Sequence, residues 1–279
     1  YFTSNLATHS NAGMVATNLG LDFDSTIHPR LTVRYGYEWG GGPTGDGGVD
    51  EDKRITILFE NVTANPPGGY YSSRNQLTKT QDANSNQREM FVICHNNDYL
   101  TKRYARHATV AHEFQHLIEY NTVYKKYGTY PLSFFNEGLS QNAEGYGGYG
   151  PDSRMSYVQA DPRLSYALWG MQNKDINNSY GAAFAVVEYM VRRFGEGFIN
   201  TLTDAPITSI ANVDTLLKTG GYAAGYPGIV LDMLTAHYLN DGVYRYPAGG
   251  LYPGDTGIDT LGTTPGWNGY SSGGPVTNN

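Results

Sequence analysis

The chain has 279 residues, which is enough to bury a core in one large domain or in two lobes that share a site. Its formal net charge is −7, so the chain lacks the excess of basic residues that is typical of a nucleic-acid-binding protein. It also has no cluster of Lys and Arg that would indicate binding to an anionic membrane surface. The single cysteine, Cys94, excludes an intramolecular disulfide, and its apolar setting in MFVIC predicts a buried packing role.

The chain begins YFTSNLATHS, without an initiator Met or the basic and apolar segments of a leader peptide. This start is typical of a chain from which a leader has been removed, so we expect a secreted, extracellular protein. No apolar run reaches the ~20 residues that a membrane helix needs, so we expect no membrane insertion.

Three stretches of the first hundred residues are rich in β-branched and aromatic residues and are separated by Gly, Pro, Asn and Asp. They are LTVRYGY at 31–37, ITILFEN at 55–61 and EMFVICHN at 89–96. We therefore expect a sheet in this half of the chain.

An acidic loop, GGGPTGDGGVDEDK, lies between the first two of these stretches. Its acids are Asp46, Asp50, Glu51 and Asp52. Their oxygens could wrap a calcium ion. The loop lacks the EF-hand spacing, however, and a solvated acidic turn is the competing interpretation.

The pattern becomes helical from residue 101, because apolar residues recur at threes and fours with no Pro or Gly before Gly128. A second helix is expected to begin near 132–135 and to stop at the glycine run GYGGYG. A helix pair with a glycine break is expected over 181–204, and another helix over 226–241. The second half is therefore predicted to be mainly helical, and the segment from Pro247 to Asn279 shows no periodicity.

The motif HEFQH lies inside the first of these helices. His112 and His116 are four residues apart, so both imidazoles lie on one face and can reach one ion, with Glu113 beside it. This spacing on a helix is typical of a zinc site with a glutamate general base. The competing interpretation is a polar helix face whose histidines bond to neighbouring groups.

A catalytic zinc ion needs a third protein ligand and an open fourth position. The metzincin continuation would place Gly and His where this chain has Glu119 and Thr122, so that class is excluded. The gluzincin continuation places a glutamate on a following helix, and NEGLS supplies Glu137. Glu119 and Glu144 are the competing ligands, and we expect a surface role for Glu119.

HEFQHLIEY followed by FFNEGLSQNAE resembles the hyicolysin family of bacterial metallopeptidases, within the thermolysin-like gluzincin group. The likeness also includes IHPRLTVRYG, DGGVDEDKRITILFENV, GGYY, SNQREMFVI and SYGAAFAVVEYMVRRFG, and so covers about residues 20–205. The resemblance implies that His112, His116 and Glu137 hold zinc and that Glu113 is the general base.

The sequence departs from the thermolysin pattern at one place. An Asp that bonds a zinc-bound histidine stands four residues after the ligand glutamate in that pattern, and this chain has Gln141 there. A glutamine carbonyl can accept the same hydrogen bond without contributing a negative charge. Gln141 and Glu144 both share the face of Glu137, so either could orient a ligand histidine.

We expect an α+β gluzincin-type fold. An N-terminal mixed-sheet lobe, 1–121, would end in the HEFQH helix. A mainly helical lobe, 122–279, would carry the third ligand and the Gly-rich tail, with the active-site cleft between the lobes. The strand at 89–96 is the predicted sheet edge that would hold a peptide substrate by strand addition.

The expected mechanism combines a zinc-activated water with proton transfer by Glu113 to the leaving amine. Tyr180 is the candidate donor to the oxyanion, because it begins a helix where related gluzincins place a Tyr or His. A packed or surface tyrosine is the alternative interpretation. His237 could serve instead, although a lone histidine on a helix face is usually structural.

The leading hypothesis is a secreted, monomeric zinc endopeptidase that acts on proteins or peptides. One alternative is a catalytically weak relative that binds a protein or a glycan. The other is a gluzincin that hydrolyses a non-protein substrate. Intact Glu113 argues against the binding module, because a structural zinc site fills four protein ligands and needs no adjacent base.

Overall fold

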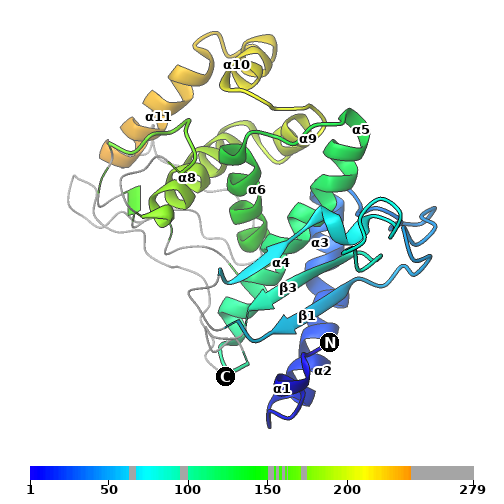
Figure 1. Ribbon diagram of the computed structural model, residues 1–279. Helices are drawn as coiled ribbons and strands as arrows, with labels where there is room; N and C mark the ends of the chain where they lie inside the picture. Colours follow the sequence, from blue (N-terminus) through cyan, green and yellow to red (C-terminus); the bar gives the residue numbers. More distant parts are fainter. Residues whose placement is uncertain are drawn as a thin grey trace. The chain divides into compact units, whose positions relative to one another are not determined.

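The computed structural model describes residues 1–62, 67–94, 100–149, 154, 157–158, 161, 163–170 and 175–239. The chain divides into two compact units, Tyr1–Gly128 and Thr129–Asn279. The first unit combines helices with a three-stranded sheet, and the second is helical in its described part, so the protein is a mostly helical α+β protein (Figure 1). The segment 247–279 lies outside the described residues.

The first unit begins with helices. They are α1 (Ser4–Ala7), α2 (Ala12–Asp22), the π-helical turn η1 (Phe23–Ile27) and α3 (His28–Tyr35). None of these helices was predicted from the sequence.

The predicted strand at 31–37 is wrong, because most of it lies in α3. Leu31 and Tyr35, four residues apart, are buried, whereas Val33 between them is 80% exposed. A strand would place all three side chains on one face, and a helix separates Val33 from the other two. Burial of one helix face therefore outweighs the β-propensity of the stretch, and Gly36, at φ 91°, ends the helix.

The sheet consists of β1 (Thr56–Glu60), β2 (Gly69–Tyr71) and β3 (Met90–Cys94), and a 3₁₀ turn, η2 (Ser73–Gln76), follows β2. The strand order is β1-β3-β2, with β1 parallel and β2 antiparallel to β3. The strands predicted at 55–61 and 89–96 are thus confirmed.

The prediction that the strand at 89–96 forms the sheet edge is wrong, because β3 is the central strand. Every residue of β3 is buried, as the uninterrupted apolar run MFVIC requires of a strand covered on both faces. Residue Phe2 pairs with Phe59 and covers the outer side of β1. Among the described residues, β2 is therefore the edge that no further strand covers.

The HEFQH motif lies in α4 (Arg103–Glu119), which packs against β2 and β3 and beside α3 (Figure 1). The π-helical turn η4 (Tyr120–Tyr124) and the short α5 (Lys125–Tyr127) continue it. Gly128, in the left-handed conformation at φ 72°, ends the segment, so the helix predicted from residue 101 to Gly128 is confirmed.

The second unit contains five longer helices among its described residues. They are α6 (Ser133–Tyr146), α8 (Ile176–Phe194), α9 (Gly197–Thr203), α10 (Ile210–Thr219) and α11 (Gly225–Leu239). The break between α8 and α9 at Gly195, φ 85°, confirms the predicted helix pair, whereas α10 was not predicted. No helix in the described part of the chain is long and apolar enough to span a bilayer.

Candidate metal centre

Helix α4 buries polar side chains among apolar ones. Val110, Ala111 and Phe114 are completely buried, and His112 and Glu113 among them are only 7% and 6% exposed. Burial of an imidazole and a carboxyl costs free energy unless polar partners or a metal compensate for it. Apolar residues at these positions would pack more favourably, so the polar ones indicate a functional site.

His112 and His116 stand one helical turn apart. Their ring centroids lie 4.9 Å apart and the ring planes are inclined by 75°. The nitrogens of two such rings can approach one point from different directions, which is the geometry that a shared ion requires. The i, i+4 expectation from the sequence thus describes the local structure of α4.

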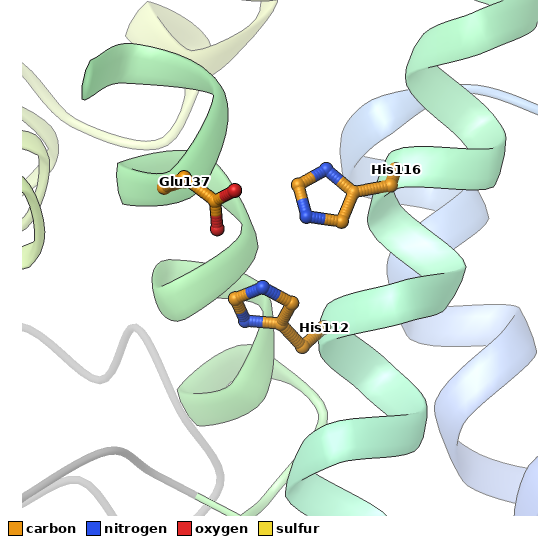
Figure 2. Close-up of side chains that lie close together, drawn as sticks. All are labelled: His112, His116 and Glu137. Carbon is orange, nitrogen blue, oxygen red and sulfur yellow. The ribbon is translucent and has the colours of Figure 1, made fainter. Parts of the chain in front are cut away.

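Glu137 completes a group of three potential ligands (Figure 2). One ligand atom from each of His112, His116 and Glu137 lies within 4.8 Å of the others. His112 is buried, and the other two side chains are half-buried. Two imidazole nitrogens and one carboxylate oxygen suit a first-row transition metal, and three protein ligands leave a coordination position for water or substrate.

The packing of α6 orients Glu137. A methyl group added at Gly138 would lie 2.7 Å from Val187 Cγ2 and 2.8 Å from the carbonyl oxygen of Ala183, so α6 and α8 are in close contact there. This contact fixes the rotation of α6 about its axis. Successive helical residues differ in direction by about 100°, so Glu137 projects to another side of α6 than the face packed on α8.

Glu119, a competing ligand, is not part of the group of three. The expected surface role is wrong, because Glu119 is only 2% exposed.

His107 of α4 is also outside the group of three. Its Nε2 lies 2.8 Å from Asp22 Oδ2, and its Nδ1 lies 2.8 Å from the carbonyl oxygen of Arg103.

Gln141 and Glu144 belong to a buried hydrogen-bond network in the second unit. Gln141 Nε2 donates to Glu144 Oε1 at 2.7 Å, and Arg154 Nε donates to Gln141 Oε1 at 2.9 Å. Arg154 also donates to Asn177 Oδ1 at 2.6 Å. Gln141 carries no negative charge, unlike the aspartate of the thermolysin pattern. Its amide group lies between the carboxylate of Glu144 and the guanidinium of Arg154.

The two candidate oxyanion donors have different surroundings. Tyr180, near the start of α8, is half-buried, with the guanidinium of Arg154 4.8 Å from its ring centroid and Trp169 packed edge-on at 4.9 Å. His237 on α11 is 2% exposed, and burial lowers its pKa to about 3, so its imidazole is neutral. Neither residue belongs to the group of three potential ligands.

Sequence reasoning missed the relation between Glu113 and β2. A methyl group added at Gly69 of β2 would lie 3.1 Å from Glu113 Cγ and 2.6 Å from the carbonyl oxygen of Val92. The backbone of the edge strand therefore passes directly beside the motif glutamate. The strand β2 lies within the segment GGYY, which is too short to show the alternating pattern that predicts a strand.

The remaining predicted positions are not joined to this group. Cys94 is free and buried, as expected, and burial raises the pKa of its thiol to about 11, so it is unreactive near neutral pH. Among the described residues, no three of the acids at 46, 50, 51 and 52 converge on one point. Asp52 pairs instead with Arg54, whose Nε donates to Asp52 Oδ1 at 2.9 Å and to Asp52 Oδ2 at 3.0 Å.

The chemical capability of the centre follows from its donors and from the adjacent carboxylate of Glu113. Three ligands of this kind can hold a divalent transition metal, and a neighbouring carboxylate can accept and return a proton. No protein-family model matches the chain, and no curated protein matches it significantly.

Proposed function

We propose that this protein is a zinc-dependent endopeptidase of the gluzincin type, similar to the hyicolysin family. The observation that carries the proposal is the convergence of His112, His116 and Glu137, with the buried carboxylate of Glu113 next to the first histidine. A purely structural zinc site would contain a fourth protein ligand, and such sites need no adjacent base.

Glu113 is the general base in this proposal. Zinc bound to the three ligands would supply a Lewis acid that activates water and polarises the scissile carbonyl. Glu113 accepts the proton of the attacking water and transfers it to the leaving amine as the peptide bond breaks. Its burial between α4 and the backbone of Gly69 keeps the carboxylate out of bulk solvent and fixes its position.

The edge of β2 is the proposed binding surface for the substrate backbone. An extended peptide can add to an uncovered strand edge through main-chain hydrogen bonds. The edge of β2 meets two requirements: no other described strand covers it, and Gly69 brings its backbone against Glu113. A peptide bound there would run beside the general base, which favours a peptide over a compact non-protein substrate.

Tyr180 is the proposed donor to the oxyanion. Its phenol group can donate a hydrogen bond, and the contacts with Trp169 and Arg154 restrict its ring. The neutral, deeply buried imidazole of His237 is less suited to this role.

Casein digestion with Glu113→Gln tests the proposal. We expect about 10²-fold or greater loss of activity, because the general base is removed, while zinc content by elemental analysis stays at the wild-type level. The control is Glu196→Gln, a charge removal at an exposed position on the second unit, which should leave the rate unchanged.

A chelator should abolish cleavage by the wild type, and added zinc should restore it. His116→Ala should lose both zinc and activity. Undiminished cleavage by Glu113→Gln would refute the base assignment. If zinc-loaded wild type cleaves neither casein nor short peptides, the binding-module or non-peptide alternatives would replace the proposal.

A further inference from the structure

Two buried glutamates contact the glycine-rich loop 40–48. Glu38 precedes the loop in sequence and lies against Gly41, and Glu89, immediately before β3, lies against Gly48. Each is only 3% exposed. Carboxyl groups are rarely buried to this extent unless they are paired or bind a metal, so their surroundings need an explanation.

The loop folds back on itself between the two glutamates. The amide of Gly47 donates to the carbonyl oxygen of Gly40 at 3.0 Å, and a methyl group added at Gly40 would lie 1.9 Å from the amide nitrogen of Gly48. Only glycine permits this approach of two backbone segments. The two backbone segments of the loop are thereby brought into direct contact.

Both carboxylates are directed at this folded loop. A methyl group added at Gly41 would lie 2.3 Å from Glu38 Oε1, and one added at Gly48 would lie 2.2 Å from Glu89 Oε1 and 2.8 Å from its Oε2. The loop has no side chains at these two positions, so the carboxylate oxygens lie against the backbone.

One oxygen of each carboxylate has a partner and the other has none. Glu38 Oε1 lies 3.1 Å from His28 Nε2, and Glu89 Oε1 accepts a hydrogen bond from the amide of Val49 at 3.3 Å. The Oε2 atoms of Glu38 and Glu89 are buried without a hydrogen-bond partner. A buried carboxyl oxygen without a hydrogen-bond partner is costly, and a cation bound at the loop would supply that partner.

The nearby cations do not fill this role in the structure. Lys125 places its Nζ over the ring of Trp39, 3.2 Å from the centroid, rather than on either carboxylate. Arg88 Nε approaches Asp50, at 4.0 Å. Asp50 adds negative charge near Glu89, and burial together with this charge raises the pKa of Glu89 to about 7.

We propose that the loop 40–48 with Glu38 and Glu89 is a binding site for a calcium ion, separate from the His112 group. The free Oε2 atoms supply the two anionic ligands, and carbonyl oxygens of the glycine loop supply the remainder. Calcium accepts six to eight oxygen ligands in irregular geometry, whereas magnesium requires a near-octahedral shell that a glycine loop cannot impose. From the sequence, a calcium ion was considered at Asp46, Asp50, Glu51 and Asp52, whereas this site uses two buried glutamates.

Terbium luminescence tests this site without any reference to peptidase activity. Tb³⁺ replaces Ca²⁺ at oxygen sites, and Trp39, next to Glu38, can sensitise its emission. We expect sensitised emission from zinc-loaded wild type, displaced by Ca²⁺ with a dissociation constant of roughly 10⁻⁴ to 10⁻³ M, the range of extracellular calcium modules. Millimolar Ca²⁺ should also raise the melting temperature by several degrees.

Glu89→Gln and Glu38→Gln should each weaken Ca²⁺ displacement of terbium at least tenfold and remove the calcium-dependent rise in melting temperature. Glu51→Gln removes an exposed charge three residues beyond the loop and is the matched control, expected to behave as wild type. Circular dichroism verifies that each variant is folded.

Absence of calcium-displaceable emission from wild type would overturn the proposal, and so would wild-type affinity in both glutamate variants. Loss of binding in Glu51→Gln alone would assign the ion to the exposed acids instead. None of these results depends on cleavage of a substrate, so the calcium site and the peptidase function can fail separately.

Discussion

A buried ion pair in the second unit makes a strong prediction about stability. Arg192 Nε donates to Glu188 Oε1 at 2.5 Å within α8, and Asn142 Nδ2 on α6 donates to Glu188 Oε2 at 2.7 Å. The Glu188 and Arg192 side chains are 0% and 1% exposed. The network therefore links α8 to the helix that carries Glu137, and Arg192→Met would leave the Glu188 carboxylate buried without its counter-charge.

The expected cost of Arg192→Met is about 3–5 kcal/mol of unfolding free energy, the usual loss when one partner of a buried pair is removed. This is a large share of the ~5–15 kcal/mol that stabilises a typical domain. Glu188→Gln combined with Arg192→Met leaves no uncompensated charge and keeps an amide oxygen as acceptor for Asn142 Nδ2, so it should recover most of the loss. Urea unfolding of the two variants, followed by circular dichroism, measures both values.

A loss of less than about 1 kcal/mol of unfolding free energy in Arg192→Met would contradict this prediction, because the Glu188 carboxylate would then be solvated or paired elsewhere. A double variant as unstable as the single one would show that packing volume, rather than charge, is decisive.

Three further changes test other contacts. Gly69→Val should abolish casein cleavage while zinc stays bound, because its side chain would collide with the carbonyl of Val92 and with the motif glutamate, as zinc analysis and kinetics would show. Gly138→Ala should cost roughly 1–3 kcal/mol in urea unfolding, because its methyl group would overlap Val187. Desolvation raises the pKa of Asp22, but hydrogen bonds from a guanidinium and an imidazole outweigh it and hold the pKa below its usual value. The stabilising contribution of Asp22 is therefore present above pH ~4 and is lost as the pH falls through its lowered pKa. Asp22→Asn should accordingly destabilise the protein at pH 7 and much less in acid. Thermal unfolding measured across that pH range checks this expectation.

The elements that the sequence predicted correctly have strong local signals. The helix from 101 to Gly128 combines a long 3.6-residue period with a glycine that can adopt positive φ. The spacing of HEFQH determines the relation of its histidines once the helix is known, because i and i+4 share a face. Local periodicity therefore suffices to predict two of the three potential ligands.

The errors arise where distant packing outweighs local preference. LTVRYGY has β-branched and aromatic residues, yet it is helical because Leu31 and Tyr35 are buried on one face. Glu119 was expected at the surface because it stands only three residues after His116 on the same helix, too close to share its ion. It is instead buried on a helix that is enclosed along much of its length. No pattern within a few residues encodes these environments.

The partnership of Glu113 with Gly69 shows why a motif alone gives an incomplete site. In the proposed function, HEFQH supplies a base and two ligands from one helix, but a base is useful only if the substrate backbone can reach it. A strand of three residues, with glycine where the helix is closest, permits that approach. A larger residue at position 69 would push the strand away from the helix. The proposed site therefore depends on this glycine as well as on the carboxylate that it faces.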